Sequence, residues 1–151
     1  MKKLFCIALC AISMVGCANY AGILKDGTYY QPGLDESLQA EHAKLDIARI
    51  DGKSGIALHF IALDAELVQS TQTFSTKLRT IYLNPGRRQV EFFYDGLSKA
   101  KGCFSAMFQS GHEYVFKYKK DHKGLHYRLE DMTDERVVSM GGCKHMRGFK
   151  L

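Results

Sequence analysis

Hydrophobic and polar residues alternate along much of the chain. The alternation is sharpest where Tyr114, Phe116 and Tyr118 occupy every second position, with Val115 and Lys117 between them. Side chains of a strand point to opposite faces in turn, so this pattern predicts a strand with an aromatic face in the protein interior. A sugar or a peptide stacked on that face is the alternative interpretation. Further strand-like runs cover residues 45–50, 55–63, 103–109, 125–130 and 136–140.

Residues 79–94 predict a β-hairpin, because two strand-like runs flank a tight turn at Asn84, Pro85 and Gly86. Proline fixes φ at about −65°, which suits the second position of a turn. Gly86 then supplies the positive φ that a type II turn requires at its third position. We expect this turn to fix the register of two neighbouring strands.

Turn signals such as Asp51-Gly52 and Ser110-Gly111 separate the predicted strands at intervals of about ten residues. No stretch has the periodicity of an amphipathic helix of ordinary length, and most of the strands have one polar face. The sequence therefore predicts an all-β protein, with a small antiparallel sandwich or barrel over residues 43–151. Residues 17–42 predict a tether, and residues 64–76 predict a polar loop or an edge strand.

The first residues have the pattern of a bacterial signal peptide. Lys2 and Lys3 precede an apolar run at residues 4–15. This run is too short to cross a bilayer as a permanent helix, which takes about 20 residues. We therefore expect residues 1–16 to be a signal peptide.

Residues 14–17 read Met-Val-Gly-Cys and resemble the lipobox of bacterial lipoproteins. The resemblance implies cleavage after Gly16 and acylation of Cys17, which would anchor the chain in a lipid bilayer. Ala18 follows the cysteine, and in that family this implies sorting to the outer membrane, with the protein facing the periplasm. The alternative is an ordinary secretory peptide in which Cys17 is an unmodified thiol.

The net charge of the mature chain is small. The full sequence has 21 Lys and Arg against 16 Asp and Glu, and removal of Lys2 and Lys3 leaves 19 against 16, a net charge of +3. Nucleic-acid binding normally requires a clearly basic face or a strongly basic domain, so we expect no nucleic-acid partner.

Two cysteines, Cys103 and Cys143, remain after loss of the signal peptide and acylation of Cys17. In an oxidising compartment two such thiols most often form a disulfide. Closing this 40-residue loop would stabilise the fold by roughly 4 kcal/mol. A soft-metal site formed by Cys103, Cys143 and His145 is the alternative.

Several short motifs follow one another in a recognisable order. An Asp-Gly turn precedes Leu-Asn-Pro-Gly at residues 83–86, then Arg-Arg-Gln-Val-Glu-Phe-Phe-Tyr at 87–94 and Ser-Gly-His-Glu-Tyr-Val-Phe at 110–116. This order resembles that of small bacterial lipoproteins with a PEGA-like or transthyretin-like β-sandwich, over roughly residues 44–139. The resemblance implies a non-catalytic, surface-layer or adhesion-like role, and it brings no catalytic residues.

The sequence contains no pattern typical of an active site. There is no Gly-x-Ser-x-Gly elbow, and Ser54, Ser105 and Ser110 stand apart from any obvious base. We therefore expect no enzymatic activity and no cofactor.

Basic residues gather near two predicted turns. Lys117 and Lys119 lie, with Lys120 and Lys123, near one hairpin end, and Arg87 and Arg88 follow the Pro-Gly turn. One interpretation is a candidate partner contact at Arg87, Arg88, Lys117 and Lys119, for lipid headgroups, lipopolysaccharide phosphates or an acidic partner. The alternative is a solvated face whose lysines discourage aggregation of strand edges.

Together these features predict a membrane-anchored periplasmic lipoprotein that acts as a non-catalytic binding or assembly module of the cell envelope. An envelope protein, peptidoglycan and lipopolysaccharide are all open as partners. One alternative is a small inhibitor or sensor that captures a soluble ligand or a hydrolase with a loop. The other is the metal-binding protein with the Cys103, Cys143 and His145 site.

Overall fold

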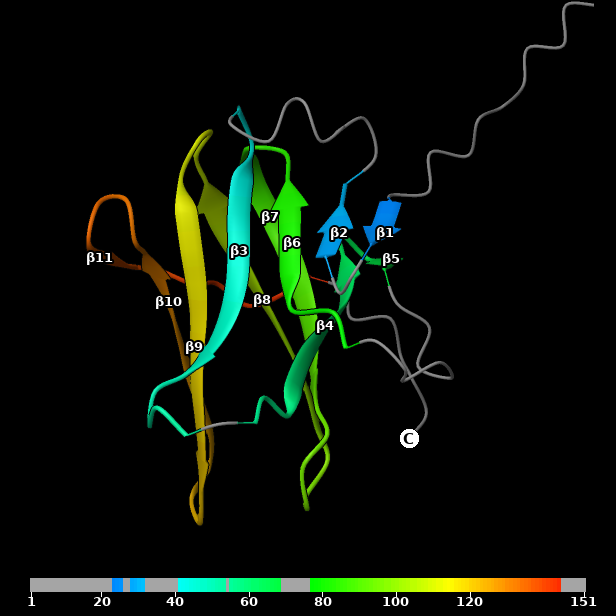
Figure 1. Ribbon diagram of the computed structural model, residues 1–151, viewed down its shortest axis with the longest axis vertical. Helices are drawn as coiled ribbons and strands as arrows, with labels where there is room; N and C mark the ends of the chain where they lie inside the picture. Colours follow the sequence, from blue (N-terminus) through cyan, green and yellow to red (C-terminus); the bar gives the residue numbers. More distant parts are fainter. Residues whose placement is uncertain (1–22, 26–27, 32–40, 54, 69–76, 145–151) are drawn as a thin grey trace, which may run out of the picture.

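The computed structural model describes residues 23–25, 28–31, 41–53, 55–68 and 77–144 of the 151-residue chain, and these form two β-sheets packed face to face (Figure 1). The prediction of an all-β sandwich is confirmed. No helix among these residues is long and apolar enough to cross a membrane.

The larger sheet has seven strands and the smaller sheet has four. Most neighbouring strands are antiparallel, as predicted, but β2 pairs with β6 and β3 pairs with β9 in parallel. The order in the large sheet is β1 (Ile23–Lys25), β2 (Thr28–Tyr30), β6 (Thr80–Leu83), β3 (Ala43–Arg49), β9 (Glu113–Asp121), β10 (Gly124–Asp131) and β11 (Arg136–Val138). The order in the small sheet is β5 (Glu66–Leu67), β4 (Leu58–Leu63), β7 (Gly86–Tyr94) and β8 (Ala100–Phe108).

Aromatic rings from both sheets fill the core. Phe116 of the large sheet lies 4.7 Å from Phe104 and 4.9 Å from Phe92 of the small sheet, measured between ring centroids. Tyr114 and Tyr118 are also buried, and each hydroxyl accepts a hydrogen bond from a backbone N–H, of Gln109 and Ala57 respectively. The predicted aromatic face of this strand is therefore part of the core.

The predicted hairpin at Asn84, Pro85 and Gly86 is wrong in its pairing. The turn itself forms, and Gly86 has the expected positive φ of 114°. However, β6 belongs to the large sheet and β7 to the small sheet, so the turn carries the chain across the core. Alternating patterns in two consecutive strands are the same whether the strands share hydrogen bonds or face each other across a core, so the sequence pattern did not distinguish the two cases.

The predicted tether contains structure, and the predicted domain start at residue 43 is too late. Strands β1 and β2 belong to the large sheet, and β2 pairs with β6. Tyr29 and Tyr30 are buried, and the Tyr30 ring stacks on Tyr82 at 5.0 Å. Each of these strands has three residues, too few for a visible alternation, and β2 pairs with residues 52 positions further along the chain.

Cys103 and Cys143 form the predicted disulfide, with their Cα atoms 5.9 Å apart. The bond fastens the segment after β11 to β8, the edge strand of the small sheet. Ser105 and Gly141 exchange two backbone hydrogen bonds of 2.9 and 2.8 Å beside it. Since β11 is the edge strand of the large sheet, this segment connects the two sheets along one side of the sandwich.

Candidate functional site

Exposed charges of opposite sign gather at the two ends of the sandwich. Two hairpin loops reach the end drawn at the bottom of Figure 1, residues 95–99 between β7 and β8 and residues 122–123 between β9 and β10. Residues 50–53 and 55–57, which follow β3, lie above them in the same half of the sandwich. We call this the basic end, and define it by Leu97 and the exposed lysines Lys53, Lys99, Lys119 and Lys123.

In the β9–β10 loop, the carboxylate of Asp121 is used to hold the turn. Its Oδ1 atom accepts hydrogen bonds from the backbone N–H groups of Lys123, at 2.8 Å, and Gly124, at 3.2 Å, and lies 3.1 Å from Nε2 of His126. These contacts, the Lys123 N–H first among them, hold the pKa of Asp121 below its usual value. The side chains of Lys119 and Lys123 remain in solvent.

The β7–β8 loop is fixed at its base and projects an apolar side chain at its tip. The backbone N–H of Asp95 donates to Ala57 O at 2.8 Å, and the Asp95 carboxylate forms an ion pair with Lys77 at 3.6 Å. Gly96 is required because a Cβ there would lie 2.3 Å from the Tyr94 ring. The next residue, Leu97, has a relative exposure of 112 %, so its whole side chain stands in water.

The loop after β3 uses its acidic residue internally as well. Arg49 donates to both carboxylate oxygens of Asp51, at 2.8 and 2.7 Å, and the Lys53 backbone N–H donates to Oδ1. The Arg49 hydrogen bonds are the main reason that the pKa of Asp51 lies below its usual value. The ammonium group of Lys53 has no carboxylate within ion-pair distance among the described residues.

The basic end therefore carries uncompensated positive charge. Its acidic residues already have partners within the protein: Asp51 pairs with Arg49, Asp95 pairs with Lys77, and Asp121 accepts backbone N–H groups of its own loop. The four exposed lysines that define this end form no ion pair within the described part of the chain. Such a surface attracts anions and lowers the free energy of complexes with them.

The opposite end has the reverse character. Glu41, Glu113 and Glu135 are exposed there and form no ion pair with any described residue, and neither does the exposed cation Arg87. The molecule is thus electrically polarised along its strands.

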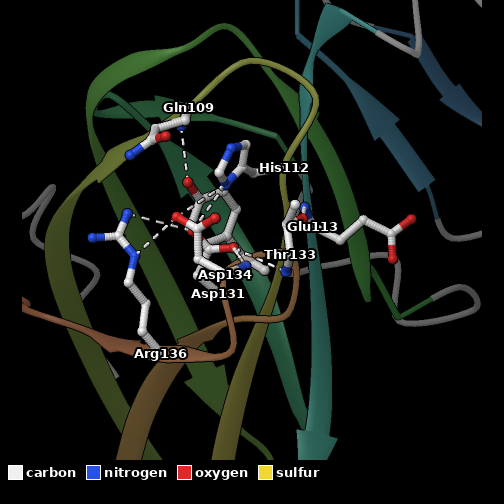
Figure 2. Close-up of polar contacts among 8 residues, drawn as sticks. Gln109, His112, Glu113, Asp131, Thr133, Asp134 and Arg136 are labelled. Atoms are coloured by element: carbon white, nitrogen blue, oxygen red, sulfur yellow. Dashed lines mark hydrogen bonds and ion pairs between the residues drawn. The ribbon is translucent and has the colours of Figure 1, made fainter.

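A polar cluster at this second end, around Asp131, is the densest group of ionisable residues. Figure 2 shows His112, Asp134 and Arg136 converging on the Asp131 carboxylate, which is fully buried. Nδ1 of His112 lies 3.0 Å from Asp131 Oδ2, and Arg136 Nη2 lies 3.6 Å from the same atom. Oδ1 accepts the backbone N–H groups of Thr133, at 3.1 Å, and Asp134, at 3.2 Å.

Two opposing effects act on the pKa of Asp131. Burial raises it, but the hydrogen bonds from His112 and from the turn N–H groups outweigh burial and hold this pKa below its usual value. The carboxylate is therefore charged in the folded protein. Its two oxygens join the turn before β9, the end of β10 and the start of β11, so we call the group the Asp131 clamp.

The donor atoms of the Asp131 clamp are of the types that bind divalent metal ions. One atom each from His112, Asp131 and Asp134 lies within 4.8 Å of the others. However, the guanidinium of Arg136 already faces this group, with Nε 3.2 Å from Asp134 Oδ2. A metal ion would have to displace that cation, so the arrangement fits an internal ion-pair network better than a metal centre.

The structure does not bring the four predicted partner-contact residues together. Arg88 pairs with Asp64 at 3.1 Å and donates to the carbonyl groups of Asn84 and Pro85, so it holds the turn. Lys117 pairs with Glu130 on the neighbouring strand. Arg87 and Lys119 are exposed, but they lie at opposite ends of the sandwich.

Sequence reasoning missed Lys53 and Leu97 at the basic end. Leu97 offered a signal, since it is the one large apolar residue inside the polar stretch from Asp95 to Gly102. Lys53 offered none, because a lysine beside an Asp-Gly turn is ordinary.

The two remaining predicted residues, Cys17 and His145, lie outside the described residues. With the Cys103–Cys143 disulfide in place, neither sulfur is available as a thiolate ligand, so the proposed metal site would require the reduced protein. Searches with family models, curated proteins and solved structures found no match to this chain.

Proposed function

We propose that this protein is a membrane-anchored lipoprotein of the bacterial cell envelope that binds an anionic envelope component through its basic end. In this role it is a non-catalytic binding or assembly module. The observation that carries the proposal is the charge imbalance at that end. Three carboxylates there already have partners within the protein, and four exposed lysines form no ion pair with any described residue.

The anchor and the location rest on the sequence. The Met-Val-Gly-Cys motif favours acylation of Cys17, and Ala18 after it favours sorting to the periplasmic face of the outer membrane. The PEGA-like resemblance supports the same kind of role, since it implies binding without catalysis. The partners proposed here, which carry suitable negative charge, are anionic phospholipid, lipopolysaccharide and peptidoglycan.

A second candidate function, an inhibitor or sensor that captures its target with a loop, is favoured by Leu97. This side chain projects from a loop whose base is fixed at Gly96 and Asp95, as a capturing loop would require. It differs from the first candidate in its salt dependence, because a complex held by an apolar side chain changes little with salt.

Two measurements test the proposal. The intact mass of protein extracted from membranes should correspond to a chain that begins at Cys17 and carries acyl groups, with one disulfide. An unmodified Cys17 would remove the anchor from the proposal.

The second measurement is co-sedimentation of residues 18–151, which include every described residue, with three separate probes: anionic phospholipid vesicles, lipopolysaccharide and peptidoglycan sacculi. We expect at least one probe to sediment the protein at low salt and to release it at a few hundred millimolar salt, because exposed charges are screened over about 8 Å at physiological ionic strength. Salt-insensitive binding, or no binding to any probe, would contradict an electrostatic contact at the basic end.

A further inference from the structure

We infer that the basic end docks on an anionic phospholipid bilayer, with Leu97 inserted among the headgroups. This inference rests on the proposed binding role of the basic end and names its partner. Its starting point is the chemistry of that end, where a fully exposed leucine and four exposed lysines lie in or beside separate loops.

The side chain of Leu97 is fully exposed, so its contact with water contributes no hydrophobic stabilisation to the fold. The loop around it is adapted to present it, since Gly96 lets the Tyr94 ring close over the loop base and Asp95 is held by Lys77 and Ala57. An apolar side chain flanked by basic residues matches the boundary between headgroups and acyl chains, where both kinds of group are satisfied. Carboxylate polymers would satisfy the lysines but would offer no apolar environment for Leu97.

The lysines lie where they would meet the phosphates of the same surface. Lys99 is two residues from Leu97 on the β7–β8 loop. Lys119 lies near the end of β9 and Lys123 lies in the β9–β10 loop, which reaches the same end of the sandwich (Figure 1). The two loops belong to different sheets, so together they offer a broad contact. Basic residues near an anionic membrane each strengthen binding by roughly fivefold.

The length of chain before β1 is compatible with docking on the bilayer that holds the proposed anchor. Strand β1 begins at Ile23, at the end opposite the lysines, because Ile23 pairs with Tyr30, Tyr30 with Tyr82, and Tyr82 with Lys44 at the start of β3. The six residues from Cys17 to Ile23 reach about 20 Å when extended, and β9, with nine residues, is about 30 Å long. A sandwich tethered at this distance can therefore lean until its basic end meets the same membrane.

The chain contains no tryptophan, which allows a direct test with the full acylated protein. Leu97→Trp places a single fluorophore at the proposed insertion point, and Val137→Trp, an exposed residue at the opposite end, is the matched control. Each variant is reconstituted in neutral phosphatidylcholine vesicles and in vesicles with phosphatidylglycerol, with brominated lipids as quenchers.

We expect Leu97→Trp emission to shift to shorter wavelength and to be quenched in the anionic vesicles, with high salt reversing both effects, and Val137→Trp to remain as in water. Leu97→Ser should weaken the binding of residues 18–151 to these vesicles by roughly tenfold. Absence of quenching at position 97, or equal quenching in neutral vesicles, would overturn the inference. If lipopolysaccharide or peptidoglycan still bound in a salt-dependent way, the proposed function would stand with another partner; if no probe bound, both would fall.

Discussion

The two ends of the sandwich contain similar residues but use them in opposite ways. In the Asp131 clamp, a buried carboxylate is shared by His112, Arg136 and two backbone N–H groups, so the charges satisfy one another. At the basic end, carboxylates such as Asp121 are used in their own loops and the neighbouring lysines stay in solvent. The first arrangement stabilises the fold, and the second leaves charge available for a partner.

In this protein, a dense group of ionisable residues does not mark the binding site. The clamp is the denser cluster, yet every oxygen of Asp131 already has donors. What marks the basic end is the absence of counter-ions for its lysines within the described ranges, together with the exposed Leu97.

The largest effect is expected from breaking the clamp. Asp131→Ala would leave Arg136, His112 and two turn N–H groups without their acceptor, so we expect the free energy of unfolding to fall by about 4 kcal/mol. Urea denaturation measures this change. Asp134→Ala, which removes a half-exposed partner of Arg136, is the control and should cost about 0.5 kcal/mol. Equal effects of the two substitutions would mean that Asp131 has no special structural role.

The second, slightly smaller effect on stability is expected when the pH is lowered, and it comes from a histidine near the basic end. His59 is buried on β4, and burial lowers its pKa to about 4, with the positive charge of Lys77 acting in the same direction. Between pH 6.5 and pH 4 the unfolded chain binds a proton at this histidine that the folded protein does not. The free energy of unfolding should therefore decrease as the pH is lowered through this range, by up to about 3 kcal/mol.

The variant His59→Leu tests the origin of this pH dependence, measured by urea denaturation at several pH values. The loss of stability between pH 6.5 and about pH 5 should disappear in the variant, because this range lies above the ordinary pKa values of Asp and Glu, where carboxylates with a lowered pKa such as Glu130 do not yet contribute. Asp131 has a lowered pKa, so its contribution to the free energy of unfolding is present above the ordinary Asp pKa. In both the unmodified protein and His59→Leu it is lost only as the pH falls below about 4. An unchanged profile in His59→Leu would assign the upper part of the titration to another group.

The smallest effect on stability is expected at the basic end itself. Lys119→Glu with Lys123→Glu alters two exposed side chains that have no described ion pair, so the free energy of unfolding should change by less than about 0.5 kcal/mol. Thermal unfolding measures it. A large loss would show that these lysines stabilise the fold, and the contrast between the two ends would disappear.

Much of the fold could be predicted from alternation, and the reasons for the failures are physical. Strands β8, β9 and β10 are long and half buried, so their pattern is visible in the sequence. The partner of β6 could not be predicted, because Ile81 and Leu83 face the core in either a hairpin or a crossing between sheets. Strand β2 joins the sheet by pairing with β6, which follows far along the chain, and β1 joins it by pairing with β2.

The candidate site was harder to predict. The lysines at the β9–β10 loop were visible as a cluster, but sequence alone does not show that Lys117 is neutralised by Glu130 while Lys119 is not. That difference follows from the strand register, which places Lys117 opposite Arg128 and beside Glu130. The opposite positions of Arg87 and Lys119 likewise follow from the direction of each strand, which the wrong hairpin concealed.

The most direct test of the central claim compares charge reversal at the two ends. Lys119→Glu with Lys123→Glu alters the basic end, and Arg87→Glu alters an exposed arginine at the other end that forms no ion pair with any described residue. Both variants are sedimented with whichever probe binds the unmodified chain, at low salt. We expect binding to fall at least about tenfold for the lysine pair and to change less than about twofold for Arg87→Glu. Equal losses would contradict the claim that the basic end carries the contact, as would full binding by the lysine variant.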